Sequence, residues 1–377
     1  MNSNRKKRIY EISGLPISAH YSASKISWLL QYDETILNPT DQFIWLCIPD
    51  YLVFKLTGNL ATENTVASRT LCLNVKTGNW SDEIKRIFEI SNVSFPPIFR
   101  AGEKLGMVTG KVASLFDNEC VVTIAGHDHM CGASGIELKD DELLDSTGTT
   151  EAIMALTISP DTTLEAQRMG ITNGIYTDGK HNTRFSVIPS AGSTIAWFMK
   201  VFRIDESKLH KLLKRAQDAY DHHEIFESQV LVIPHFKGSG APNKSSLSKG
   251  LIYGLTTETS LEELIFGLFL GLTCEYYIMY STIFEKNKYH KIKVIGPATQ
   301  DNLWLQLKAD LFGMEVDNIA VDQAVSQGAY SVATGNYLQN DTVRYIPTDD
   351  NAKKSYLLDV MLKKYQKIYH NKVKCNF

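Results

Sequence analysis

A single carboxylate between two imidazoles is the most suggestive arrangement of chemically active side chains in the sequence. Asp128 stands between His127 and His129. The preceding apolar residues 121–125 predict a buried strand, and the small residues 132–135 predict a closely packed helix start. A turn from strand to helix presents side chains at the carboxyl edge of a sheet, where α/β proteins bind ligands. Asp128 is therefore the first candidate for a catalytic residue, and its alternative role is to cap the following helix.

Three further turns combine glycine with other small or hydroxyl residues. In the turn Ser146–Thr150, Gly148 permits a positive φ, so that backbone N–H groups and hydroxyls can converge on an anion such as phosphate. The segment Ala191–Ser193 at a predicted helix start offers free N–H donors and a favourable dipole. The small-residue turn that starts at Gly296 lets a flat ring approach the backbone. Each also has a structural explanation, as a hairpin turn, a helix start or a strand–helix connection.

His127 and His129 also suggest a second kind of activity, that of a metal-dependent hydrolase. His127, Asp128 and His129 are metal-ligand types, but adjacent side chains on an extended run point to opposite faces. The pair His222-His223 has the same difficulty, so we predict no metal ligands. The common signatures G-x-x-x-x-G-K-[ST], G-x-G-x-x-G after a strand and G-x-S-x-G are not found in the sequence.

Apolar periodicity outlines the elements that must position these residues. Strands alternate with helices, which predicts α/β layers, and the change to a strand-rich texture predicts a domain boundary near Ile136. The predicted segments are helices at 24–31, 50–57 and 81–90, two strands across 143–156, a helix from 191, a helix at 260–282, a strand at 291–296 and a helix at 302–312.

Composition excludes several classes of protein. The 377 residues are 44% hydrophobic and carry a formal charge of -3, without the long basic runs that track nucleic acid. Six widely spaced cysteines without a C-x-x-C pair predict free thiols in a reducing cytoplasm. The most apolar stretch, Leu264–Leu272, is too short and too interrupted by glycine to span a bilayer, so we expect a buried helix and no membrane partner.

Several short motifs occur in order along nearly the whole chain. They are G-L-P at 14–16, Y-S-A-S-K at 21–25, W-L-L at 28–30, I-P-D-Y-L at 48–52, K-L-T-G at 55–58, A-S-R-T at 67–70, D-S-T-G-T-T-E at 145–151 and W-L-Q-L-K-A-D at 304–310. In this order they resemble the FGGY family of carbohydrate kinases, which includes glycerol kinase, xylulokinase, gluconokinase and fuculokinase-like enzymes.

The resemblance implies an α/β fold of two actin-like, ribonuclease-H-like domains that close on a sugar and ATP. An incomplete N-terminal domain on the sugar side would cover residues 1–136, and a C-terminal domain on the nucleotide side residues 137–377. The implied reaction transfers the γ-phosphate of ATP to a hydroxyl of a sugar, polyol or sugar acid, with Mg²⁺ balancing the phosphate charge.

The resemblance also implies a role for each candidate residue. Asp128 matches the catalytic base, which takes the proton of the attacking hydroxyl. Tyr21 and His129 match positions that contact the sugar or polyol. The residues that match nucleotide contacts are Gly148 and Thr149 for the β- and γ-phosphates, Gly192 for the α-phosphate, and Gly296 and Ala298 for adenosine.

The chain departs from the family pattern in three places. Members begin with a strand-turn-strand that carries a D-x-G-T-like first phosphate motif, and no such segment precedes Gly14. In the adenosine turn the usual G-G-G reads Gly296-Pro297-Ala298, and Pro297 removes a backbone donor. Gln327 stands where many members carry an acidic residue.

Two expectations remain beside the kinase, the first because of these departures and the second because of His127, Asp128 and His129. One is a catalytically impaired pseudokinase, or a fragment that needs a complementary N-terminal chain, because lost central strands would expose unpaired edges and apolar core. The other is the metal-dependent hydrolase. The expected partners are a small sugar or polyol and either a second copy of the chain or the complementary N-terminal fragment.

Overall fold

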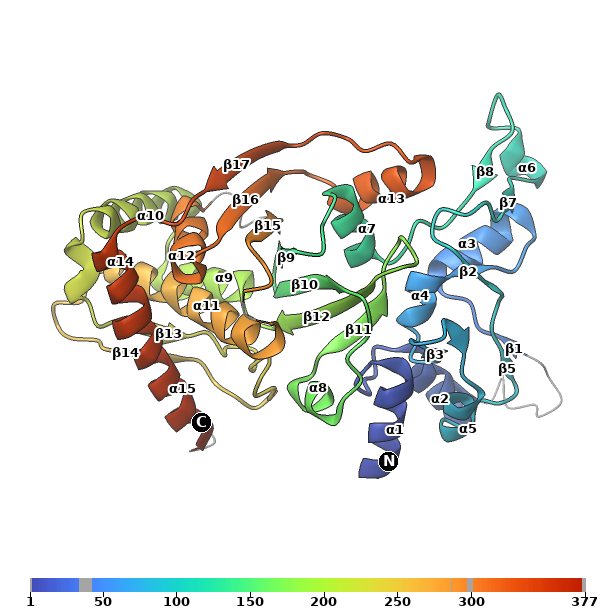
Figure 1. Cartoon of the computed structure of the whole chain (residues 1–377), viewed down its shortest axis with the longest axis horizontal. Helices are drawn as coiled ribbons and strands as arrows, with labels where there is room; N and C mark the ends of the chain where they lie inside the picture. Colours follow the sequence, from blue (N-terminus) through green and yellow to red (C-terminus); the bar gives the residue numbers. More distant parts are fainter. Residues whose placement is uncertain (1, 34–42, 286, 297–300, 375–377) are drawn as a thin grey trace. The chain divides into compact units, whose positions relative to one another are not determined.

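The computed structural model describes residues 2–33, 43–285, 287–296 and 301–374, and the chain divides into two compact units (Figure 1). Unit 1 consists of the segments Met1–Lys139, Ala155–Phe185 and Gln323–Gln339. Unit 2 consists of the segments Asp140–Met154, Ser186–Asp322 and Asn340–Phe377. Each unit therefore combines segments from different parts of the chain. The predicted division into a sugar-side domain at 1–136 and a nucleotide-side domain at 137–377 stays a prediction.

Unit 1 is built from helices and very short strands. Its helices are α1 (Ser3–Ser13), α2 (Ser22–Tyr32), α3 (Ile48–Thr57), α4 (Asn64–Ser68), α5 (Asp82–Ile87), α6 (Gly110–Ala113), α7 (Asp128–Gly135), α8 (Leu164–Met169) and α13 (Ala324–Thr334). Its two-residue strands form the pairs β1 (Phe43–Ile44) with β5 (Val93–Ser94), β2 (Thr62–Glu63) with β6 (Ile98–Phe99), β3 (Leu73–Asn74) with β4 (Asn79–Trp80), and β7 (Gly106–Met107) with β8 (Val121–Val122).

The strand before Asp128 differs from the prediction. Residues 121–125 were expected to form a buried strand, but β8 spans only Val121–Val122 and half of the Val121 side chain is exposed. β8 pairs only with the equally short β7, so a regular ladder never extends toward Asp128. The helix predicted at 81–90 is also shorter, because α5 ends at Ile87.

Unit 2 contains longer elements. Its strands are β9 (Glu142–Thr147), the start of β10 (Glu151–Thr157), the end of β12 (Asn182–Ile188), β13 (Leu231–Ile233), β14 (Leu251–Tyr253), β15 (Lys291–Ile295), β16 (Glu315–Ala320) and β17 (Asp341–Tyr345). Its helices are α9 (Gly192–Phe202), α10 (Glu206–Asp221), α11 (Leu261–Ile283), α12 (Asn302–Phe312), α14 (Asn351–Ser355) and α15 (Lys363–Lys374), with a 3₁₀ turn at Glu224–Glu227 and a π-helical stretch at Tyr356–Leu362.

The largest sheet has the strand order β11-β12-β10-β9-β15-β16-β17, where β11 is Thr172–Ile175. β15 lies between β9 and β16 and is parallel to both, whereas β9 and β10 form an antiparallel hairpin. The two strands predicted across 143–156, the strand at 291–296 and the helix at 302–312 are confirmed by this arrangement. Parallel strands joined through helices place their carboxyl ends at one sheet edge.

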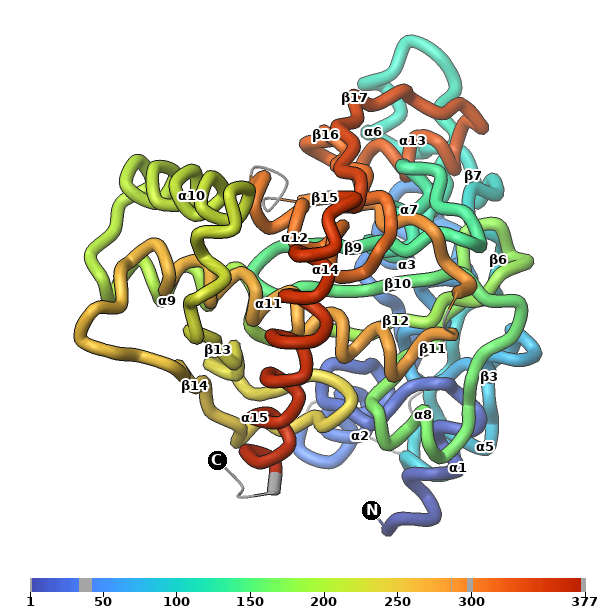
Figure 2. The backbone as a smooth tube through the Cα atoms, turned by 60° about the vertical axis from the view of Figure 1, so that its left-hand side comes forward, coloured from blue at the N-terminus to red at the C-terminus, as the bar shows by residue number. Residues whose placement is uncertain are grey.

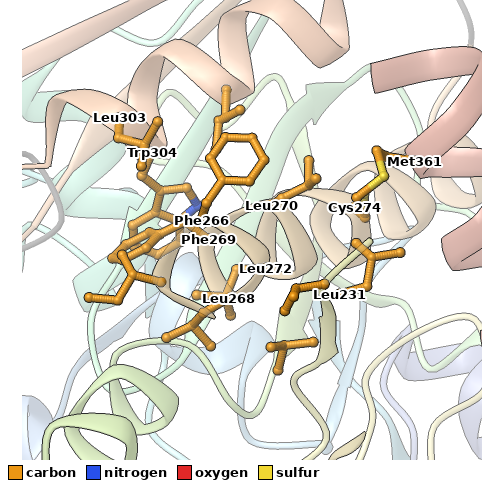
Figure 3. Packing of buried hydrophobic residues seen from close by; sticks show 14 of the residues in the cluster. Leu231, Phe266, Leu268, Phe269, Leu270, Leu272, Cys274, Leu303, Trp304 and Met361 are labelled. Atoms are coloured by element: carbon orange, nitrogen blue, oxygen red, sulfur yellow. The ribbon is translucent and has the colours of Figure 1, made fainter. Parts of the chain in front are cut away.

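The core of unit 2 surrounds α11, which packs against α10, α12 and β13 (Figures 2 and 3). Figure 3 shows Phe269 of α11 beside Trp304 of α12, an edge contact with 5.5 Å between ring centroids. By length and apolar composition alone, α11 qualifies as a helix that could cross a membrane, yet 89% of its most apolar window is buried inside the structure. The predicted buried helix is thus confirmed as a core element.

Candidate active site

Asp128 is the first residue of α7, one position after the N-cap. The N-cap residue is His127, whose side chain makes no capping bond. Asp128 Oδ1 instead accepts a hydrogen bond from the backbone N–H of His129 at 2.6 Å, and 63% of the Asp128 side chain is exposed. The carboxylate thus binds a first-turn N–H of α7 and, being exposed, also remains open to a ligand, so the catalytic role of Asp128 stays a prediction.

The ring of His127 lies against the same carboxylate. His127 Nδ1 is 2.7 Å from Asp128 Oδ1. This contact, helped by the ring of His129, holds the pKa of Asp128 well below its usual range although partial burial acts in the opposite direction. The carboxylate is thus ionised at neutral pH, which is the form that accepts a proton.

A glycine turn and a buried glutamate fix the backbone before Asp128. Gly126 has a φ of +145°, and a Cβ there would come within 2.9 Å of Thr65 Oγ1. That hydroxyl accepts the backbone N–H of His127 at 2.7 Å and donates to Glu63 Oε1 at 2.6 Å. Glu63 also caps α4, and burial raises its pKa to about 7. The entry of α7 is therefore tied to the start of α4.

Close contact between α7 and α13 fixes the far side of α7. A Cβ at Gly328 of α13 would lie 1.7 Å from the carbonyl oxygen of Cys131, and one at Gly135 would lie 2.7 Å from the carbonyl oxygen of Ala324. Only glycine allows two helix backbones to approach this closely. The neighbouring Gln327, where many family members carry an acid, donates to the carbonyl oxygen of Leu338 at 3.0 Å.

The two predicted substrate residues join one group of rings in unit 1. The ring centroids of His129 and Phe185 are 4.7 Å apart. The Arg69 guanidinium lies 5.9 Å from the Phe185 centroid and 5.7 Å from that of Tyr21. Sequence reasoning assigned no role to Arg69 or Phe185, although Arg69 stands in the A-S-R-T motif that carried the family resemblance.

The extended run assumed for the metal argument is not present. Because α7 starts at Asp128, the rings of His127 and His129 stack with centroids 5.9 Å apart rather than pointing to opposite faces. Even so, within residues 2–33, 43–285, 287–296 and 301–374 no three His, Cys, Asp or Glu side chains converge as metal ligands would.

In unit 2, the predicted phosphate turn closes the β9–β10 hairpin. Glu151 pairs with Thr147, and the N–H of Gly148 donates to the carbonyl oxygen of Thr150 at 2.8 Å. Gly148 and Thr149 thus lie in a three-residue turn, where Gly148 is half-buried and Thr149 and Thr150 are exposed. The positive φ expected at Gly148 is wrong, because this glycine is not one of those with a positive φ.

The start of α9 packs directly on this turn. The N–H of Gly192 donates to the carbonyl oxygen of Gly148 at 3.0 Å, and the N–H of Ser193 to that of Thr149 at 3.2 Å. A Cβ at Gly192 would come within 2.4 Å of Gly148 O. The buried hydroxyls of Ser193 and Thr194 have no hydrogen-bond partner among the residues that the structure describes. Two unpartnered donors at a helix start suit an anion.

The third predicted nucleotide segment meets the same hairpin. Gly296 has a φ of +103°, and a Cβ there would lie 2.0 Å from the carbonyl oxygen of Thr147. Ala298 and Pro297 lie outside the described residues. A pocket of about 280 Å³ adjoins the start of α12 and is lined by His210, Asp301 and Asn302 among others, and burial raises the pKa of Asp301 to about 6. The structure thus brings Gly148, Thr149, Gly192 and Gly296 together in unit 2.

Comparison with known proteins places these two units in a family. The N-terminal domain of the FGGY family of carbohydrate kinases matches residues 1–135, and the C-terminal domain of the same family matches residues 143–336. The chain belongs to the FGGY family of carbohydrate kinases. The resemblance seen in the motifs is confirmed.

Individual relatives are distant and longer. The chain is 25% identical over 364 residues to xylulose kinase of Staphylococcus xylosus, covering 93% of this chain and 72% of that protein. It is 25% identical over 341 residues to a glycerol kinase of Streptococcus pneumoniae, covering 88% of this chain and 66% of that protein. The chain therefore spans about two thirds to three quarters of the length of these relatives.

Solved structures share the fold. Ligand-bound xylulose kinase of Lactobacillus acidophilus superposes with a TM-score of 0.83 at 20% identity, covering 98% of this chain and 76% of that one. Glycerol kinase of Plasmodium falciparum with ADP gives 0.80 at 22% identity, covering 99% and 74%. The α/β fold is thus the two-domain actin-like ATPase fold, as the motifs predict.

Proposed function

We propose that the chain transfers the γ-phosphate of ATP to a hydroxyl group of a sugar, polyol or sugar acid, with Asp128 as the general base. The observation that carries this proposal is the ionised, exposed carboxylate of Asp128 at the start of α7, at the position that matches the family's base. Family membership supplies the reaction class.

The side chains around Asp128 give the reaction its acceptor side. Asp128 Oδ1 is engaged by the N–H of His129 and by the ring of His127, which leaves Oδ2 to take the proton of the acceptor hydroxyl. Tyr21 and His129 would contact the acceptor, and Arg69 and Phe185 hold these two rings in one group.

The hairpin turn and the start of α9 give the reaction its nucleotide side. The unpartnered hydroxyls of Ser193 and Thr194 fit phosphate oxygens, and the turn at Gly148 and Thr149 would face the β- and γ-phosphates. Mg²⁺ neutralises charge on the transferring phosphoryl group when it is bound, and it takes most of its ligands from phosphates and water. Gly296 and Ala298 would lie against adenosine.

The test is ADP formation by the full chain with a panel of pentoses, hexoses, polyols and sugar acids. The proposal predicts acceptor-dependent ADP release that Asp128→Ala abolishes. Equal turnover by the wild type and Asp128→Ala would contradict the role of Asp128 as general base. ADP release without an acceptor would indicate an ATPase.

A second candidate is a chain that is inactive alone and needs a complementary polypeptide. It is favoured by apolar side chains on the surface of unit 1, where Trp28, Tyr32 and Ile48 are 59%, 63% and 75% exposed. Activity that appears only on addition of an N-terminal D-x-G-T segment from a relative would establish this candidate. We also propose a cytoplasmic location and, as the other possible partner, a second copy of the chain.

A further inference from the structure

A fully buried lysine in unit 2 contacts two fully buried carboxylates. The side chains of Lys308, Asp145 and Glu151 are each 0% exposed. Lys308 Nζ donates to Asp145 Oδ2 and, at 2.6 Å, to Glu151 Oε1. The ammonium also lies 4.2 Å from the ring centroid of Trp304 and 5.0 Å from that of Tyr276. None of these side chains has a part in the proposed reaction.

The two carboxylates stand at the neck of the predicted phosphate turn. Asp145 lies on β9 two residues before the strand ends at Thr147, and Glu151 is the first residue of β10. Glu151 and Thr147 form the last pair of the hairpin before the turn at Gly148. Because Lys308 contacts one carboxylate from each strand, its ammonium ties the two sides of the neck together.

The lysine also connects this neck with the segment that precedes the predicted adenosine contact. Lys308 lies in the second turn of α12, which begins at Asn302. The strand that leads to Gly296 is β15, and its Val294 pairs with Asp145. Thr147 Oγ1 donates to the carbonyl oxygen of Ile295 at 3.1 Å. The hairpin neck, the end of β15 and α12 are therefore connected to one another around Lys308.

Such a cluster is a poor way to gain stability. Burial raises the pKa of both Asp145 and Glu151, because an ionised carboxylate loses its hydration there, and the charge of Lys308 acts in the opposite direction. Apolar side chains of similar volume often stabilise a buried site as well or better. The directional contacts of Lys308 do what apolar side chains cannot, since they fix the position of each carboxylate relative to the other.

We propose that Lys308 is a positioning residue that holds the turn at Gly148 and Thr149 in the conformation that receives the nucleotide phosphates. The inference rests on the proposed function, because it takes these phosphates as the ligand of the turn. Without Lys308, the two carboxylates at the neck would lose the ammonium that joins them. The turn would then loosen, and the segment at Gly296 would be disturbed less, because β15 is also held by its pairing with β16.

The test compares variants of the full chain. Lys308→Met alone strands two buried carboxylates without a cation and endangers folding. The main variant therefore combines Lys308→Met with Asp145→Asn and Glu151→Gln, and a milder variant carries Glu151→Gln alone. The matched control combines Lys293→Met with Glu142→Gln, which removes a 2.8 Å ion pair between β15 and β9, away from the turn.

Two measurements are made on each variant: amide hydrogen exchange of residues 146–150 and calorimetric affinities for ADP and for adenosine. We expect exchange in the turn to quicken by about tenfold in the triple variant. ADP affinity should weaken by about tenfold, and adenosine affinity by clearly less. The Glu151→Gln variant should show a smaller effect of the same kind, and the control should resemble the wild type.

Unchanged exchange in the turn, an equal loss of ADP and adenosine affinity, or the same effects in the control would each overturn the inference. A wild-type chain that binds neither ADP nor adenosine would contradict the proposed function instead. In that case, amide hydrogen exchange of residues 146–150, compared between the triple variant and its control, would still show whether Lys308 holds the turn.

Discussion

At the scale of single residues, the chemistry of Asp128 depends on its two histidine neighbours. The N–H of His129 and the ring of His127 both engage Oδ1, so these two contacts leave the second carboxylate oxygen free. The sequence predicted Asp128 as a candidate catalytic residue from its place between two imidazoles, and the family resemblance implied that it is the base. The sequence did not predict the paired geometry, because that depends on where the helix begins.

Replacing His127 by asparagine should change the pH dependence of the reaction. Because its pKa is depressed, the Asp128 carboxylate stays ionised even at a pH within the usual range of aspartate pKa values. It protonates only as the pH falls through the lowered pKa. In His127→Asn the pKa of Asp128 rises toward about 4, the ordinary value. The acid limb of kcat/KM should therefore move to higher pH.

The measurement is the pH–rate profile of the wild type, His127→Asn and the control His181→Asn. His181 also pairs with a carboxylate in unit 1, at 2.6 Å from Asp178, and has no part in the proposed site. An acid limb that stays in place in His127→Asn would show that the ring does not set the ionisation of Asp128.

At the scale of elements, the position of Asp128 depends on how closely α7 approaches α13. These helices are far apart in sequence, and Gly328 is the point where their backbones come closest. The sequence predicted a helix start at the small residues 132–135, packed closely against a sheet. In the structure these residues lie at the end of α7, and the close contact is with α13. The partner helix could not be predicted, because the glycine that permits the contact lies almost 200 residues away.

Gly328→Ala should force these two helices apart. The new methyl group would clash with the carbonyl oxygen of Cys131, and overpacking of this kind costs about 2 kcal/mol in the free energy of unfolding. The intrinsic helix preference of alanine offsets this by no more than about 1 kcal/mol. Urea unfolding measures the loss, with Ser326→Ala on the exposed face of α13 as control.

An unfolding free energy of Gly328→Ala equal to that of Ser326→Ala would contradict the close packing. Displacement of α7 should also lower kcat, since the carboxylate of Asp128 moves with the helix start.

At the scale of the whole molecule, the sequence predicted the class of fold and most elements of unit 2. The long apolar run of α11 and the strand–turn–strand pattern of β9 and β10 are local sequence patterns. Such elements can be predicted because residues close together in the sequence determine them. Which segments belong to which unit could not be predicted in this way. Residues 155–185 and 323–339 belong to unit 1 because of contacts with residues far away in the sequence, and no local sequence pattern indicates such contacts.

The state of the cysteines belongs to this scale as well. All five cysteines that the structure describes are free, and burial raises the pKa of Cys72 and Cys131 to about 12. Thiols held protonated in this way react slowly with alkylating agents. Native chain treated with iodoacetamide at neutral pH should therefore keep Cys72, Cys131 and Cys274 unmodified, whereas denatured chain should lose all three thiols. Rapid labelling of these residues in the native chain, read by peptide mass spectrometry, would contradict the packing of both cores.

The central claim is that Asp128 is the base of a phosphoryl transfer. The most direct test measures label transfer from γ-labelled ATP to the best acceptor by the wild type, Asp128→Asn and Asp178→Asn. Asp178 is the matched control, because it too is a carboxylate of unit 1 paired with a histidine. We predict that Asp128→Asn lowers kcat by about 100-fold or more, which is the usual contribution of a general base, while Asp178→Asn has wild-type activity. Equal rates of transfer in Asp128→Asn and Asp178→Asn would contradict the account.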